Sequence, residues 1–281
     1  KSFFYNILLL SSIMLIIFGT IAWMLIIPTT TYQESMLKNY YKENGLQYKT
    51  FQIPVDGTTN LNVLAILPDR FDTMENEEIA AIIHFKSVRN EKAQAVSLMW
   101  SVARHGFATF IVDGRGYDES GNLQEFYDQE PWDIPKVIDY LVKSYPQINQ
   151  THLGASGFNY GAGVLLIAQA IEPRIFTSVL YQPATNLSQQ YLQYRSQQIP
   201  GDLTNYGLLQ GKETRDAFYW CNSTNSNNIM LIQGTQDEII APAKTSELYA
   251  HLNGGSRDDI LLINREGLNN QATINDVTAK K

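Results

Sequence analysis

Apolar and polar positions alternate along this chain on two different periods. Short runs with almost no polar residue, such as Ile79–His84 and Phe107–Val112, are typical of strands that are covered on both faces. Other segments, such as Trp132–Lys143, repeat apolar residues at helical spacing. The remaining strand-like runs are Gln47–Pro54, Leu61–Leu67, Ser178–Tyr181, Ile229–Gln233 and Ile260–Ile263, and the remaining helical runs are Gln94–His105 and Thr245–Leu252. Repeated alternation of this kind predicts an α/β fold with a mostly parallel sheet flanked by helices.

One glycine-rich stretch, Gly154–Gly163, follows the strand-like pair His152-Leu153 and leads into an apolar helical run. Within it, Gly157 and Gly161 flank Asn159 in the pattern G-x-N-x-G. This spacing predicts a turn so tight that the flanking positions require glycine and the central residue stands above the sheet edge. A hydrolase carries its nucleophile there, but a neutral amide has no ionisable proton and is a poor nucleophile. The pattern therefore predicts the frame of an active site without its reactive atom.

The first thirty residues differ from the rest of the chain. Ile7–Ile27 has no charged residue and is long enough to cross a bilayer as a helix. Trp23 lies near one end of the run, where an aromatic side chain suits the membrane interface. A cleaved signal peptide is the alternative, and the length of the run argues against it. We expect a single-pass anchor over residues 1–30, a stalk over 31–45, and an extracytoplasmic domain over 46–281 whose segment Asn186–Asn228 forms a lid-like insertion.

Composition narrows the classes of function. The chain has 281 residues and a formal net charge of −7, and this acidic balance argues against nucleic acid as a partner. The single cysteine, Cys221, excludes an internal disulfide. Neither a CxxC pair nor an HExxH helix occurs, so we expect no metal and no cofactor. Sequons begin at Asn149, Asn186 and Asn222, about as many as an Asn-rich chain contains by chance.

A long stretch upstream of the elbow carries a family resemblance. Ala103–Gly121 reads ARHGFATFIVDGRGYDESG, and it is similar to a strand followed by the D-x-R-G-x-G-x-S-G loop of the α/β-hydrolase superfamily. Asp118 stands where that loop usually has glycine. With the elbow and with Gly234–Asp237, which resembles the acid loop, the similarity covers residues 46–268. It points to the serine-aminopeptidase-like and acyl-ester-hydrolase-like branches. The resemblance implies an α/β-hydrolase fold, with Asp237 at the acid position of a catalytic triad.

The departures from that family concern the triad itself. The resemblance places Asn159 at the nucleophile position and Leu268 at the histidine position, and leucine accepts no proton. In the oxyanion region, Phe85 replaces a glycine of the family and is expected to narrow the space in which the first oxyanion N–H group would lie. Tyr160, which follows the elbow residue, belongs to the same region. The family often has a histidine at the position of His84, and that histidine is usually structural, so we expect a structural role for His84.

The other candidate side chains are also expected to be structural. His105 and His251 fall on predicted helices, and His152 starts the elbow strand at its far end. Ser156 is expected to be buried in the elbow strand, and Ser120 matches a loop serine that is not the family's nucleophile. Asp237 is expected to bond to the backbone of its own loop.

These observations predict a catalytically degenerate, membrane-anchored hydrolase-like protein that acts as a structural or interaction component with protein partners. Two alternatives stay open. The vestigial pocket, with Asn159 and Tyr160 at its floor, could hold a small acyl-type ligand. Alternatively, Asn159 could orient a water for Asp237 in an unusual ester, peptide or acyl hydrolase.

Overall fold

The computed structural model describes residues 39–75, 77–86, 92–116, 120, 129–185, 216–220, 228–238, 240–254 and 258–268. The chain divides into two compact units, residues 1–47 and residues 48–281. Of the first unit, only residues 39–47 are described, and they form a helical turn that leads into the first strand. The second unit contains the α/β domain.

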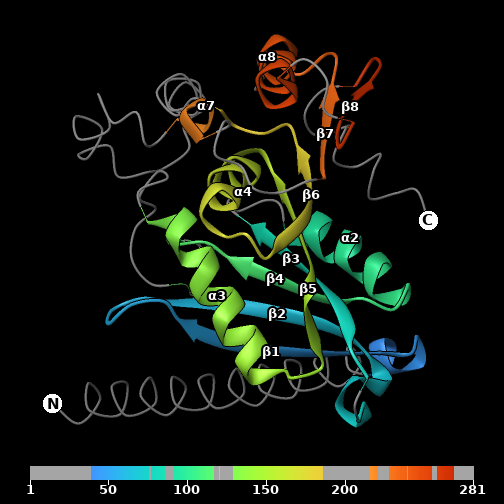
Figure 1. Ribbon diagram of the computed structural model, residues 1–281. Coiled ribbons are helices and arrows are strands. Elements are labelled where there is room, and N and C mark those ends of the chain that lie inside the picture. The colour runs from blue at the N-terminus through green and yellow to red at the C-terminus, as the bar shows by residue number, and fades with distance from the viewer. Residues whose placement is uncertain are drawn as a thin grey trace, which may run out of the picture. The chain divides into compact units, whose positions relative to one another are not determined.

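Eight strands form one sheet in the order β1-β2-β4-β3-β5-β6-β7-β8 (Figure 1). Strand β2 runs antiparallel to β4, and the pairings from β4 through β3, β5, β6 and β7 to β8 are all parallel. The strands are β1 (Leu46–Pro54), β2 (Asn60–Pro68), β3 (Ile79–Lys86), β4 (Ala108–Asp113), β5 (Ile148–Phe158), β6 (Ile175–Tyr181), β7 (Ile229–Gly234) and β8 (Ile260–Arg265). The mostly parallel sheet that the sequence predicts is therefore confirmed.

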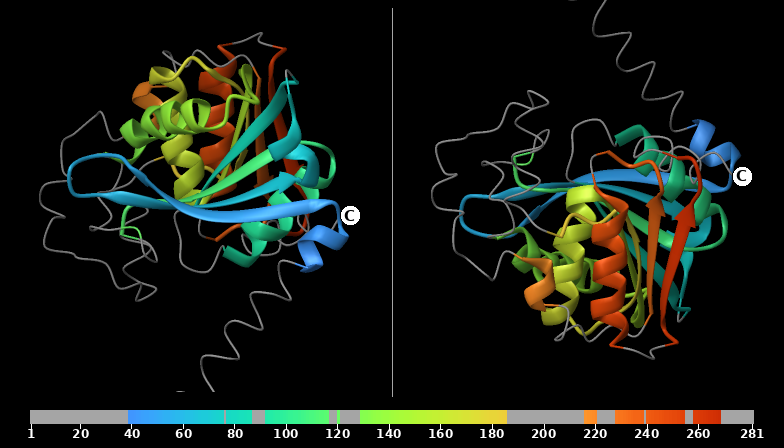
Figure 2. Two further views of the ribbon diagram at one scale, coloured as in Figure 1. Left: turned by 90° about the horizontal axis from the view of Figure 1, so that it is seen from below. Right: turned by 90° about the horizontal axis from the view of Figure 1, so that it is seen from above.

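Helices cover both faces of this sheet. The described helices are α2 (Lys92–Arg104), α3 (Glu130–Ser144), α4 (Asn159–Ile171), α7 (Ala217–Trp220) and α8 (Pro242–Asn253), with a short 3₁₀ turn, η1 (Asp69–Thr73). Helix α2 lies on one face, and α3, α4 and α8 lie on the other (Figure 2). Helix α2 is followed by Gly106, whose φ of 90° and N–H bond to Ala103 end the helix as the sequence predicts.

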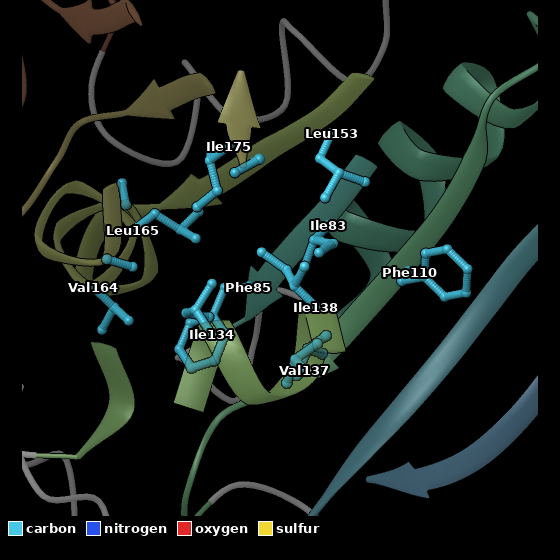
Figure 3. Close-up of a cluster of buried hydrophobic side chains, with 14 of the residues drawn as sticks. Ile83, Phe85, Phe110, Ile134, Val137, Ile138, Leu153, Val164, Leu165 and Ile175 are labelled. Atoms are coloured by element: carbon cyan, nitrogen blue, oxygen red, sulfur yellow. The ribbon is translucent and has the colours of Figure 1, made fainter. Parts of the chain in front are cut away.

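The main hydrophobic core lies between the sheet and the helices α3, α4 and α8. Alternate residues of β3 and β4, among them Ile83, Phe85 and Phe110, point into it. Helix α4 is apolar on nearly every side, because its first eleven residues are all buried. Figure 3 shows part of this core, in which the side chains of α3 and α4 meet those of β3 and β5.

The elbow strand is longer than expected. The sequence predicts that the elbow strand begins at His152, but β5 already starts at Ile148 and continues to Phe158. Glycine has a low strand propensity, but the backbone from Leu153 onward is held as a strand because it pairs with β3 on one side and β6 on the other. The sharp turn therefore falls between Phe158 and Asn159, and His152 lies four residues inside the strand.

Candidate active site

The elbow has the backbone geometry of a nucleophile position. Asn159 is the first residue of α4 and has a φ of 47°, in the left-handed region that non-glycine residues rarely adopt. Asparagine tolerates this region better than most residues do, because its short polar side chain bonds locally. The side chain is only 6% exposed, and the backbone carbonyl accepts a hydrogen bond from Ala184 N–H at 3.0 Å. The elbow thus holds a buried amide where a hydrolase has its nucleophile.

Gly157 makes this turn possible. A Cβ atom at this residue would lie 2.8 Å from the backbone nitrogen of Ala162 and 2.8 Å from the carbonyl carbon of Gly161. Both atoms belong to the first turn of α4, which crosses directly over the end of β5. The close approach of strand and helix therefore requires glycine, as the spacing predicts.

Asp237 is held by its own loop. Its Oδ1 accepts a hydrogen bond from Ile240 N–H at 2.9 Å, and its Oδ2 accepts one from Gln233 Nε2 at 3.2 Å. Gln233 is fully buried, and its Oε1 accepts a hydrogen bond from the Thr245 hydroxyl. This carboxylate lies after β7, where the resemblance places the triad acid, but both of its oxygens stabilise the loop instead.

Leu268 lies beside this acid loop. Its carbonyl accepts a hydrogen bond from Gln236 N–H at 2.9 Å, one residue before Asp237. Thr235 N–H bonds to the Arg265 carbonyl at 3.1 Å, and its hydroxyl accepts Gly267 N–H at 2.9 Å. The loops after β7 and β8 are therefore joined along their length. Leu268, which the resemblance places at the histidine position, therefore lies next to the acid loop, and its side chain cannot accept a proton.

Phe85 and Tyr160 both point into the protein. The Phe85 ring packs in the core beside Ile134 (Figure 3), and a Cβ at Gly114 would lie 3.0 Å from its Cζ. Residues 87–91, which follow β3, are outside the described residues, so the expected crowding of the oxyanion position stays a prediction. The Tyr160 hydroxyl donates a hydrogen bond to Glu130 Oε1 at 3.1 Å.

Glu130 is a residue that the sequence analysis missed. It is the first residue of α3, it is 1% exposed, and it fixes the side chain of the residue after the elbow. Its position in the first turn of a helix is the only sequence signal, because a carboxylate is favourable there. That signal does not distinguish a buried carboxylate from a solvated one.

A row of buried polar side chains lies on the face of the sheet opposite the main core. His84 Nδ1 and Ser156 Oγ are 2.8 Å apart on neighbouring strands, and the His84 ring contacts the Phe158 ring edge-on. Two residues further along β3, Lys86 Nζ forms a buried ion pair with Asp113 at 3.0 Å. Ser156 lies inside the strand as expected.

Burial makes His84 a neutral residue. Loss of solvent, and secondarily the positive charge of Lys86, lower the pKa of His84 to about 3. Its Nδ1 contacts Ser156, and its Nε2 has no hydrogen-bond partner in the described part of the chain. A fully buried imidazole on the face opposite the elbow helix has the structural character that the sequence predicts.

We expect this histidine to make the fold sensitive to mild acid. Its pKa is about 3 in the folded protein and about 6.5 in the unfolded chain, so between these values only the unfolded chain binds the proton. The free energy of unfolding then has its full value above pH 6.5 and decreases as the pH is lowered. The loss is about 2 kcal/mol from pH 6.5 to pH 5, at roughly 1.4 kcal/mol per pH unit. Urea unfolding of the full chain at the two pH values measures this loss.

The matched control is His84→Asn, which removes the titrating ring and keeps a polar atom near Ser156. This variant starts less stable, but its stability should change much less between pH 6.5 and pH 5. An equal loss in the variant and the wild type would assign the acid sensitivity to other groups.

The loop that follows β4 is fixed by Arg115. Its guanidinium contacts both carboxylate oxygens of the fully buried Asp133 on α3, at 2.6 and 2.8 Å, and Asp56 in the β1–β2 turn at 2.7 Å. Bonding to the Thr58 backbone, then to Arg115, holds the pKa of Asp56 well below its usual range. The Ser120 hydroxyl accepts Asn62 N–H and donates to the Asp113 carbonyl, so it is structural as expected. Arg115 and Ser120, in the loop after β4, thus connect β2, β4 and α3 through hydrogen bonds and ion pairs.

The remaining histidines, His105, His152 and His251, are exposed and lie on other parts of the sheet and helices. No group of three or more His, Cys, Asp or Glu residues able to hold a metal ion occurs within the described residues. Cys221 and most of the predicted insertion lie outside them. None of the described helices has the length and apolar composition needed to cross a membrane, and the predicted anchor, Ile7–Ile27, is also outside the described part.

Comparison with known proteins places this geometry in a family. The sequence profile of the prolyl oligopeptidase family matches residues 94–268, whereas no curated protein is a significant match. Among solved structures, the esterase Pf2001 of Pyrococcus furiosus is similar at 18% identity and a TM-score of 0.65, over 84% of this chain and 88% of the esterase.

Two larger peptidases are similar over only part of their length. A putative dipeptidyl aminopeptidase IV of Bacteroides ovatus is 18% identical with a TM-score of 0.66, over 83% of this chain and 34% of the other. The acylaminoacyl peptidase of Pyrococcus horikoshii is 15% identical with a TM-score of 0.64, over 82% and 38%. Likeness at this identity shows the fold, which is the α/β-hydrolase fold that the sequence resemblance implies. Since the family profile covers more than half of the residues, the chain belongs to the prolyl oligopeptidase family.

Proposed function

We propose that this chain is a catalytically silent hydrolase-fold protein that serves as a structural or interaction component of a membrane-associated assembly. One observation carries the proposal: the strained elbow is intact, and the residue that it holds is Asn159. A neutral amide cannot be deprotonated to attack a carbonyl. Loss of one residue of a triad costs roughly 10⁴–10⁶ in rate, and here the residue at the histidine position is also unsuitable.

The other polar residues near the site do not support a replacement mechanism. A hydrolase in which Asn159 orients a water would need Asp237 as the base. Both oxygens of that carboxylate already accept hydrogen bonds, from Ile240 N–H in the loop and from the Gln233 side chain on β7, as expected for a structural carboxylate. Ser120 and Ser156 are buried and bonded to structural partners.

Described aromatic side chains support a role in binding a protein partner. Trp132 on α3 is 41% exposed, and Tyr219 on α7 is 53% exposed. Trp220 lies between them, with ring centroids 6.0 Å from Trp132 and 5.4 Å from Tyr219. Tyr and Trp are the side chains that most often anchor interfaces. Two of the three belong to the predicted insertion Asn186–Asn228, which we propose carries part of the partner surface.

The membrane part of the proposal depends on the uncharged run Ile7–Ile27, whose length suits a bilayer-spanning helix. A single span that precedes a large folded domain would keep that domain at the membrane surface. We propose that the domain lies on the extracytoplasmic side.

We expect the full chain to remain with membranes after alkaline carbonate extraction, and to be digested by protease added outside intact cells or spheroplasts. In the same membranes it should hydrolyse esters, amides and thioesters no faster than membranes that contain Asn159→Ala. It should also remain unlabelled by a fluorophosphonate probe.

Release of the chain into the soluble fraction would contradict the anchor, and protection from external protease would contradict the orientation. Turnover that Asn159→Ala abolishes would show that the protein is an enzyme.

A further inference from the structure

The last strand of the sheet, β8, has one open edge within the described structure. It is at the end of the strand order, and β7 is its only neighbour among the described strands (Figure 2). The carbonyls of Asp259 and Arg265 accept hydrogen bonds from β7, at Ile229 N–H and Thr235 N–H. Since the direction of the backbone groups alternates along a strand, the N–H and C=O groups of 260, 262 and 264 point outward.

Within the part of the chain that the structure describes, this edge lacks the features that usually prevent strands from pairing. The first four of its six residues, Ile260–Ile263, include no proline and no charged side chain, and Leu261 is 48% exposed. Native proteins protect edge strands with charges, prolines or bulges, and an apolar unprotected edge is a template for another strand. A strand that is added here would bury Leu261.

The charges at the two ends of β8 are of opposite sign, with Asp259 just before the strand and Arg265 as its last residue. The three outward-facing residues are symmetric about Leu262. An antiparallel partner with the same sequence, related by a two-fold axis at Leu262, therefore puts Leu262 opposite its own copy and Ile260 opposite Asn264. In this register Asp259 of each copy lies opposite Arg265 of the other, at both ends of the pair.

We propose that two copies of this chain associate through β8, in antiparallel register about Leu262, to form a continuous sheet across a two-fold axis. Leu261 of one copy packs on Ile263 of the other as a closely spaced non-hydrogen-bonded pair. Parallel pairing would put aspartate beside aspartate, so the charges favour the antiparallel arrangement. The inference does not depend on whether the site is catalytic, and it names a second copy of the chain as one partner.

A charge-exchange experiment tests the register. In homodimers of Asp259→Arg, two arginines face each other at both ends, and in homodimers of Arg265→Asp, two aspartates do. Each variant alone should self-associate about tenfold or more weakly than the wild type, because attraction becomes repulsion at both ends. A mixture of the two variants restores opposite charges at both ends and should associate as tightly as the wild type. Sedimentation velocity on the full chain in detergent measures all three cases.

Lys143→Asp on α3 is the matched control, since it makes the same change of charge at an exposed residue away from β8. It should leave self-association unchanged. A monomeric wild-type chain, or a mixture no tighter than either variant alone, would overturn the proposal.

Disulfide trapping in membranes tests the proposed neighbours directly. In a Cys221→Ser background, chains with Leu261→Cys and chains with Ile263→Cys carry different tags and are oxidised together. We expect the mixed disulfide to exceed the cross-linking of either variant with itself, because residue 261 lies opposite 263 and not opposite 261. If residues 269–281 of the same chain covered the edge instead, no mixed disulfide would form and the proposal would be wrong.

Discussion

The double variant Asn159→Ser with Leu268→His is expected to react with a fluorophosphonate probe, whereas the wild-type chain does not. The elbow already holds residue 159 at a φ of 47°, and Leu268 is bonded through its backbone to the residue before Asp237. A serine and a histidine at these positions would complete the relay of nucleophile, base and acid. Probe labelling and ester hydrolysis measure the gain.

The single variants are the controls for this experiment. Asn159→Ser alone provides a hydroxyl without a base, and Leu268→His alone provides a base without a nucleophile, so neither should be labelled. Adding Asp237→Asn to the double variant should reduce its labelling by several orders of magnitude, since the imidazole loses its orientation. Equal labelling of Asn159→Ser and the double variant would show that another residue acts as the base. A folded but unlabelled double variant would show that more than the two side chains has been lost.

Replacing Gly157 by alanine is expected to destabilise the domain by about 3 kcal/mol or more, close to the upper end of the cost of overpacking. The added Cβ would lie 2.8 Å from two backbone atoms of α4, and these cannot move without displacing the helix from the sheet. Urea unfolding of the full chain, followed by tryptophan fluorescence, measures the change.

Gly154→Ala is the matched control, because it makes the same substitution three residues earlier in the same strand. There the new Cβ would be 3.4 Å from Ile82 Cγ1 and 3.5 Å from Thr177 Cγ2, which are side-chain atoms able to adjust. Its effect should stay within about 1 kcal/mol, because the reduced freedom of the unfolded chain offsets a small steric cost. Similar losses in both variants would mean that the elbow is not the specific constraint.

The sequence alone determined the class of the fold and the position of the elbow. Runs such as Ile79–His84 have no polar face, so they had to be strands covered on both sides, and the helical segments between them had to supply the cover. The G-x-N-x-G spacing located the elbow, because the close approach at Gly157 leaves no room for a side chain. That residue 159 is a neutral amide and residue 268 a leucine follows from residue identity alone and needs no coordinates.

Only the tertiary structure decided which polar groups are joined and which are buried. Arg115 contacts Asp56, 59 residues earlier, and His84 contacts Ser156, 72 residues later, and no local pattern specifies such pairs. The same holds for Glu130, which could equally have been a solvated residue in a first helical turn until Tyr160 was placed against it. The glycine-rich end of β5 has weak strand propensity and is a strand because β3 and β6 pair with it. The tertiary structure also decides which backbone groups of β8 point outward. The N–H and C=O groups of Leu262 do so because β7 pairs with the groups of the residues on either side of it.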